Sequence, residues 1–271
     1  ATAEGTYKVG VSLTGYGSWE SELQTVQQAE LRFSMESVIV GKGMVTHLNY
    51  SPDIRLYVGG TISQTVEPLE ITLTSSDPSK VTVPATVTIP AGSYSVRFQI
   101  TGVDVAAVGT VSITASAPGY LPPETPLGVE VVLPELSIYG LAGTRSTTGI
   151  RDNFYIRLTV PGTNTSYPQL AAMDHVFDLT LVEPSPVGIV DGFWDALTDG
   201  NMISTLTLNQ GSYQTSSYYS YVGQATAEGT YKVGVSLTGY GSWESELQTV
   251  QQAELRFSME SVIVGKGMVT H

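Results

Sequence analysis

The fold class of this chain is decided by residues 69–120, LEITLTSSDPSKVTVPATVTIPAGSYSVRFQITGVDVAAVGTVSITASAPGY. Over 85–89 and 111–115, apolar residues alternate with hydroxyl residues at a period of two. Such alternation places one face of a strand in a core and the other in water, as in antiparallel sandwich sheets. Turn-forming segments such as SSDPSK and IPAGSY separate the runs. We therefore predict an all-β chain of short antiparallel strands.

The chain repeats itself. Residues 1–47 and 225–271 are identical at every position, so the sequence returns with an offset of 224 residues, from position 1 to position 225. Either a tandem array kept uniform at the gene level or a deliberate overlap would produce this identity. In both cases the natural protein has a periodic sequence, and we expect its native termini to lie outside residues 1–271.

A weaker repeat lies inside the unit. Three pairs of segments align: IRLYVGGT (54–61) with IRLTVPGT (156–163), VTIPAGSY (87–94) with LTLNQGSY (206–213), and GTVSITASAPGYLPPE (109–124) with GTYKVGVSLTGYGSWE (229–244). We infer two diverged copies of one domain, called domain A and domain B.

The alignments set the expected boundaries. We predict domain A over 28–133 and domain B over 134–251. Residues 1–27 are then the closing strands of a preceding B-type domain, and residues 252–271 begin the next A-type domain. The joint between A and B is short and contains Pro134, which predicts a stiff string of domains rather than a flexible linker.

Strand number and turn spacing favour a tandem array of immunoglobulin-like (Ig-like) β-sandwiches. The chain has no cysteine, so the disulfide core of antibody domains is absent and we expect an aliphatic, tyrosine-rich core. The SSDPS, VTIPAG and GTVSITASAPGY segments of 69–120 resemble the Ig-like repeats of large bacterial surface and secreted proteins. That resemblance implies an Ig-like fold and a place in an adhesin, stalk, surface layer or enzyme appendage.

Composition excludes several functions. The net charge of −13 at pH 7 argues against nucleic-acid partners, which need a basic stripe. No apolar run approaches the roughly 18–20 residues of a membrane helix, so we expect no membrane span in this sequence.

No catalytic motif is present. The histidines are His47, His175 and His271, and the last is the copy of the first. His47 and His175 lie in strand-like segments and are expected to be ordinary sheet residues. The sequence contains no nucleophile elbow, zinc-protease or phosphate-loop motif. We therefore expect a protein that is not an enzyme.

The segment DGFWDALTDGN (191–201) is the best candidate for a metal site. A short helix there would place Asp191, Asp195 and Asp199 on one side, and clustered carboxylates are what calcium prefers. The alternative is an inter-strand connection, helical or looped, with Phe193 and Trp194 or Leu197 buried against the sandwich. No other cofactor is expected.

Two kinds of covalent modification are conceivable. The sequons at Asn49 and Asn164 predict glycosylation in an archaeal or eukaryotic secreted protein and are chance matches in most bacteria. A lysine in an apolar pocket beside an Asn or Asp forms an isopeptide bond in some bacterial surface modules. The available lysines are Lys8 and its copy Lys232, Lys42 and its copy Lys266, and Lys80.

These observations predict a structural repeat unit of a long extracellular fibre, stalk or adhesin shaft at the cell surface. Its partners would be neighbouring repeats of the same protein, with filaments assembled through exposed strand edges. The tyrosine-rich segment 212–223 also favours association. The alternative is a carbohydrate- or surface-binding adhesin array that holds a glycan with the domain B loops 143–153 and 191–201.

Overall fold

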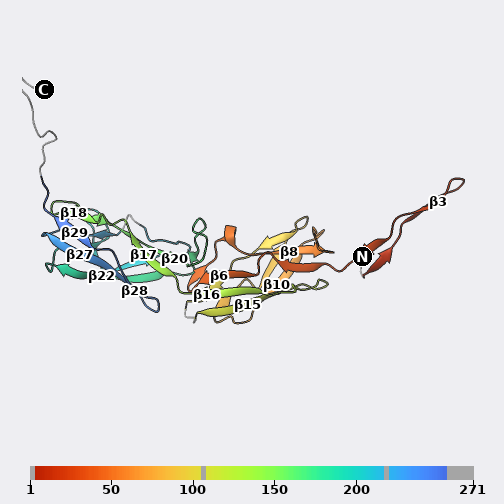
Figure 1. The fold of residues 1–271 in the computed structure, drawn as a ribbon, viewed down its shortest axis with the longest axis horizontal. Helices are drawn as coiled ribbons and strands as arrows, with labels where there is room; N and C mark the ends of the chain where they lie inside the picture. The colour runs from red at the N-terminus through yellow and green to blue at the C-terminus, as the bar shows by residue number, and fades with distance from the viewer. Residues whose placement is uncertain (1–3, 105–107, 217–219, 255–271) are drawn as a thin grey trace, which may run out of the picture.

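The computed structural model describes residues 4–104, 108–216 and 220–254. In these residues the chain forms β-strands, turns and a short 3-10 helix, η1 (Leu48–Tyr50), and no α-helix. Figure 1 shows two β-sandwiches end to end along the longest axis, with a β-hairpin projecting beyond the first. The chain is all-β, with Ig-like sandwiches arranged in a line, as predicted. Most of 252–271, including His271, and Tyr218 and Tyr219 lie outside the described residues.

The first sandwich, domain A, packs two sheets around one core. The larger sheet has the order β12 (Thr86–Ile89), β10 (Leu69–Ser75), β15 (Gly109–Ser116), β16 (Leu127–Val132), β6 (Ser37–Gly41). The smaller sheet has the order β13 (Ser95–Arg97), β8 (Asp53–Val58), β5 (Glu30–Phe33), with β9 (Thr61–Ile62) paired to β8. These ladders are antiparallel except β6 with β16, which is parallel.

The second sandwich, domain B, repeats this plan. Its larger sheet has the order β18 (Thr144–Ser146), β29 (Gln248–Gln251), β27 (Gly229–Leu237), β22 (His175–Ser185), β25 (Thr205–Leu208), with β28 (Gly241–Glu244) paired to β27. The other strands are β17 (Glu135–Tyr139), paired to β20 (Tyr155–Thr159), and the set β19 (Asp152–Asn153), β26 (Tyr221–Val222), β23 (Phe193–Trp194), β24 (Met202–Ile203). The edge strand β18 again pairs in parallel with the last strand, β29.

Matching turns accompany the matching strands. Gly92 and Gly211, which hold the same place in the aligned GSY turns, have φ angles of 75° and 79°. Gly119 and Gly239, aligned in the PGY and TGY turns, have φ angles of 82° and 81°. Glycine adopts this left-handed backbone without steric cost. These parallels support the proposal, made from the sequence, that domains A (28–133) and B (134–251) are diverged copies.

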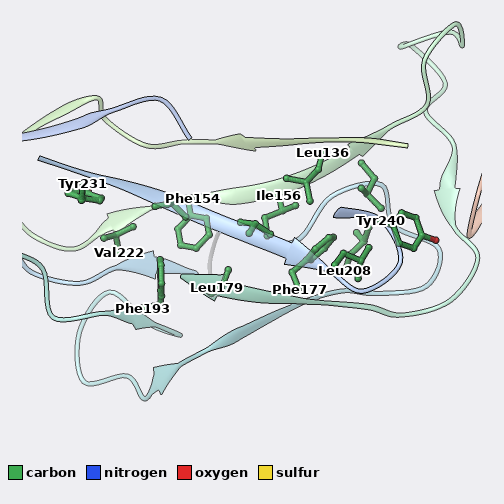
Figure 2. Packing of buried hydrophobic residues seen from close by; sticks show 14 of the residues in the cluster. Leu136, Phe154, Ile156, Phe177, Leu179, Phe193, Leu208, Val222, Tyr231 and Tyr240 are labelled. Carbon is green, nitrogen blue, oxygen red and sulfur yellow. The ribbon is translucent and has the colours of Figure 1, made fainter. Parts of the chain in front are cut away.

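Alternating burial along the strands builds both cores. In β10 every second residue from Leu69 to Leu73 is buried and the residues between are exposed. Figure 2 shows the domain B core, where Phe177, Ile156 and Leu208 lie between the sheets. Fully burying a side chain of this kind contributes roughly 1.5–3 kcal/mol. The core of domain A is mainly aliphatic, and domain B adds buried phenylalanine and tyrosine.

One segment occurs twice in the structure in different surroundings. Residues 4–26 form β1 (Gly5–Tyr7), β2 (Gly10–Leu13), β3 (Gly17–Glu20) and β4 (Gln24–Val26), which stand outside both cores. Tyr7 is 52% exposed, whereas its copy Tyr231 in β27 is 0% exposed. The same sequence is therefore buried only where the rest of a B-type sandwich is present.

Candidate functional site: the junction between domains A and B

The two sandwiches share a sheet. The strand β7 (Met44–Val45) of domain A pairs on one side with β14 (Thr101–Gly102) and on the other with β21 (Leu170–Ala171) of domain B. The Ala172 amide also donates to the Gly43 carbonyl oxygen at 2.9 Å. Because backbone hydrogen bonds cross the boundary, the two domains are held at a defined angle.

Apolar side chains cross the boundary as well. Met44 belongs by sequence to domain A, yet it is fully buried in the hydrophobic cluster of domain B. Ile39 and Val132, also from domain A, pack against the same cluster. Bending at the junction would expose this surface to water, at a cost proportional to the apolar area uncovered.

Gln169 joins domain B to the edge strand of domain A. Its side chain is buried, its Oε1 accepts from the Gly41 amide at 2.9 Å, and its Nε2 donates to the Ile39 carbonyl oxygen at 2.7 Å. One side-chain amide thus satisfies a donor and an acceptor of β6, much as a neighbouring strand would. It also covers part of an edge that would otherwise be open to pairing.

Tyr240 makes the most extensive polar contact at the junction. Its hydroxyl donates to the Asp104 carboxylate, with the Lys42 carbonyl oxygen at 3.1 Å as a second acceptor. The Lys42 ammonium lies 4.6 Å from the centroid of the Tyr240 ring and donates to the Gly239 carbonyl oxygen at 2.9 Å. Burial and the hydrogen bond to Asp104 raise the pKa of Tyr240 well above its ordinary value.

His175 and Gly43 complete this contact. The buried His175 ring meets the Tyr240 ring edge-on at 5.5 Å, and its Nε2 lies 3.2 Å from the Gly43 carbonyl oxygen. Gly43 has a φ of +66°, and a Cβ there would lie 2.2 Å from the Tyr240 hydroxyl oxygen. A side chain at this position would push the domains apart, so the close approach requires glycine.

We expect Tyr240→Phe to lower the free energy of unfolding of domain B by about 1–3 kcal/mol, because a buried hydrogen bond to a charged group is lost. The repeat supplies a matched control: Tyr16 has the same sequence context but is 87% exposed, against 6% for Tyr240. Urea unfolding followed by tryptophan fluorescence measures both variants. Equal effects of Tyr240→Phe and Tyr16→Phe would contradict the role given to Tyr240.

The acidic segment does not form the helix that was expected to place its three aspartates on one side. The helix over 191–201 is absent, because Phe193 and Trp194 form β23 and pair with β24 and β26. Asp191 accepts from the Trp194 indole at 3.1 Å, Asp195 accepts from the Asn201 amide at 2.6 Å, and Asp199 has a φ of 51°. Phe193 is buried, as the alternative interpretation expected, but Trp194 is only half-buried and Leu197 is exposed. Among the described residues no group of three or more His, Cys, Asp or Glu is placed to hold a metal ion.

The two domain B loops suggested for glycan binding do meet. The Arg151 guanidinium lies 3.8 Å from the centroid of the Trp194 ring, and its Nη1 donates to the Ala196 carbonyl oxygen at 2.7 Å. These contacts join 143–153 to 191–201 at the end of domain B that carries β18 (Figure 1).

The candidate modification sites are dispersed. Asn49 is exposed in η1, and the Asn164 side-chain oxygen accepts from the Ser166 amide at 2.8 Å. The lysines form ion pairs, at 3.7 Å for Lys80 with Asp77 and 3.0 Å for Lys232 with Glu244, or contact Tyr240 in the case of Lys42.

Sequence reasoning missed the junction residues. Gln169 contacts residues about 130 positions away, and Tyr240 contacts residues 198 and 136 positions away. His175 does begin a strand as expected, but His47 caps η1 instead of lying in a strand. The TGYG and GKGM segments, which contain Tyr240 and Gly43, each occur twice in the sequence. This duplication indicated the 224-residue repeat, but nothing in it indicated that the two segments contact each other at the junction.

No protein-family profile matches this sequence, and no curated protein matches it either. Several solved structures are similar. They include the Yersinia pseudotuberculosis adhesin InvE (14% identity, TM-score 0.33, 89% of this chain and 66% of that one) and domains 5–6 of the S-layer protein SbsC (15%, 0.30, 83% and 97%). The Escherichia coli adhesin FdeC is a third (12%, 0.33, 92% and 75%).

InvE and FdeC are adhesins and SbsC is an S-layer protein. The chain spans just under two thirds of the length of the InvE structure. Among the described residues no helix is long and apolar enough to cross a membrane.

Proposed function

We propose that this chain is a structural repeat unit of a long extracellular fibre, stalk or adhesin shaft at the cell surface. The observation that carries the proposal is the junction, where β7 pairs with strands of both domains and Met44 enters the neighbouring core. A joint with shared backbone hydrogen bonds and a shared core restricts the motion of one domain relative to the other. This restriction suits a protein that needs reach and stiffness, and it does not suit one whose binding modules move independently.

The duplicated segment supports a tandem array of these units. The contact at the B-to-A joint occurs in both copies: the Gln28 amide donates to Glu4 at 3.0 Å, and the Gln252 amide donates to Glu228 at 3.1 Å. Neighbouring repeats are therefore the partners that we propose for each end of the unit. In such a quasi-one-dimensional array, stability grows nearly additively with the number of repeats.

Electron microscopy of a protein carrying several consecutive 224-residue units tests this function. We expect straight rods whose length grows by one fixed increment for each added unit, because every joint repeats the same contacts. Particles that look like beads at variable angles would contradict the proposal.

A second candidate function is a carbohydrate- or surface-binding adhesin array that uses the loops 143–153 and 191–201. The observation in its favour is the stacking of Arg151 on Trp194, which joins the two loops into one surface. Aromatic rings with a polar neighbour are common at recognition surfaces. Loss of glycan-array binding in Trp194→Ala would support this function, and unchanged binding would contradict it.

A further inference from the structure

Two adjoining cavities open beside the junction. The first has a volume of about 360 Å³ and the second about 450 Å³, and both are lined by His47, Thr163 and Gln169. Ligand pockets in proteins span roughly 300–1,000 Å³, so each cavity is large enough for a small ring and the pair for a chain of rings. Both domains contribute to the walls, so the site exists only when A and B are joined.

Tyrosine rings line this groove. Tyr50 of domain A and Tyr167 of domain B lie 6.4 Å apart with an angle of 11° between the rings, and His47 lies 5.5 Å from Tyr167. Tyr50 is 51% and Tyr167 41% exposed, although each ring is held by its neighbour. Rings of this kind offer an apolar face together with a polar edge. A pyranose, with one C–H face and a rim of hydroxyl groups, complements such a surface.

Arg157 is the one permanently charged side chain among the described residues that line the two cavities. Among the described residues that line the two cavities there is no carboxylate, although the chain carries a net charge of −13. Arg157 lines the second cavity, where its Nη2 donates to the Gln214 side-chain oxygen at 2.8 Å and its guanidinium lies 5.0 Å from the ring centroid of Tyr139 and 5.3 Å from that of Tyr213. A fixed positive charge in a cavity whose described lining holds no carboxylate attracts an anion and disfavours a cation.

We propose that this groove binds an oligosaccharide that carries a carboxylated sugar. One ring of the saccharide stacks on Tyr50 and Tyr167, and its carboxylate lies on the Arg157 side of the second cavity. The hydroxyl groups of Thr163, Thr165 and Ser166 provide hydrogen-bond partners for the hydroxyl groups of the saccharide. This site differs from the loops at the far end of domain B, and it does not depend on the fibre function.

A glycan array printed with neutral and carboxylated oligosaccharides, probed with the full chain, tests the proposal. We expect binding to carboxylated glycans, and Tyr167→Ala should weaken it roughly tenfold through loss of stacking. Tyr167→Trp keeps an aromatic face and should retain binding. Tyr94→Ala, which removes an exposed tyrosine of domain A that lines neither cavity, should leave it unchanged.

Three results would overturn the proposal. These are no binding to any carboxylated glycan, binding to neutral glycans alone, or binding that survives Tyr167→Ala. Because Tyr167 is substantially exposed, its substitution is expected to leave the fold intact. An unchanged urea unfolding curve for Tyr167→Ala verifies that the loss comes from the groove. Absence of glycan binding would contradict the groove proposal without affecting the proposed fibre function. The two proposals can therefore fail independently.

Discussion

A protein of residues 1–224 is expected to polymerise head to tail, whereas a protein of residues 28–251 is expected to stay monomeric. The two have the same length and composition, because 1–27 and 225–251 are identical. They differ only in which end carries the closing strands of domain B. In 28–251 these strands follow their own sandwich, and both domains are complete.

In the 1–224 protein the closing strands of a B-type domain lie at the N-terminus, before domain A, and not after domain B. Domain B then lacks β27 and β29, whose buried residues include Tyr231, Val233 and Val235. Residues 4–26 project beyond domain A, on the side away from domain B (Figure 1), so they cannot fold back onto their own sandwich. They can complete the domain B of another molecule, and this head-to-tail arrangement produces open filaments.

Size-exclusion chromatography with light scattering distinguishes the two proteins. We expect a concentration-dependent series of multiples for 1–224 and a single monomer for 28–251. Adding an excess of a separate 225–251 peptide should shorten the polymers by capping free ends. A monomeric 1–224 with an unfolded domain B would refute the assignment of 1–27 as closing strands.

Tyr231→Ala is expected to lower the free energy of unfolding of domain B by about 3–5 kcal/mol, the usual cost of removing a large buried aromatic side chain. Tyr7→Ala changes the same residue in the same sequence but at an exposed position, and its effect should stay within about 0.5 kcal/mol. Denaturant unfolding followed by near-ultraviolet circular dichroism measures both. Similar losses for the two variants would mean that burial in domain B does not account for the difference.

A conservative variant separates packing from hydrogen bonding at the same site. Among the described residues the Tyr231 hydroxyl has no hydrogen-bond partner, and burial raises its pKa to about 12. Tyr231→Phe removes an unsatisfied polar group and is expected to be neutral or stabilising. A loss as large as that of Tyr231→Ala would contradict this interpretation.

The sequence was sufficient for the fold class and for the internal repeat. The alternation of apolar and hydroxyl residues over 111–115 predicted that Val111, Ile113 and Ala115 of β15 face the core, because side chains in a strand point to opposite sides in turn. The alignment of the GSY and GY turns predicted two copies of one domain, and the φ angles of the aligned glycines agree within 4° in each pair.

Contacts between domains were beyond sequence reasoning. Nothing local in the sequence around Gln169 or Tyr240 indicates that their partners lie in another domain. Tyr7 and Tyr231 make the reason plain, since identical neighbours in the sequence accompany opposite burial. The helix expected over 191–201 failed for a related reason: pairing of β23 with β24 and β26 outweighed the local spacing of the aspartates.

The central claim, that domains A and B form one stiff unit, is tested most directly by the spread of distances between them. The chain has no cysteine, so spin labels at Thr88→Cys in domain A and Thr205→Cys in domain B, both exposed, are specific. Pulsed electron spin resonance should give a single A–B distance as narrow as that of a control pair within domain A, Thr88→Cys with Thr114→Cys. A broad or multiply peaked A–B distribution beside a narrow control would contradict the claim.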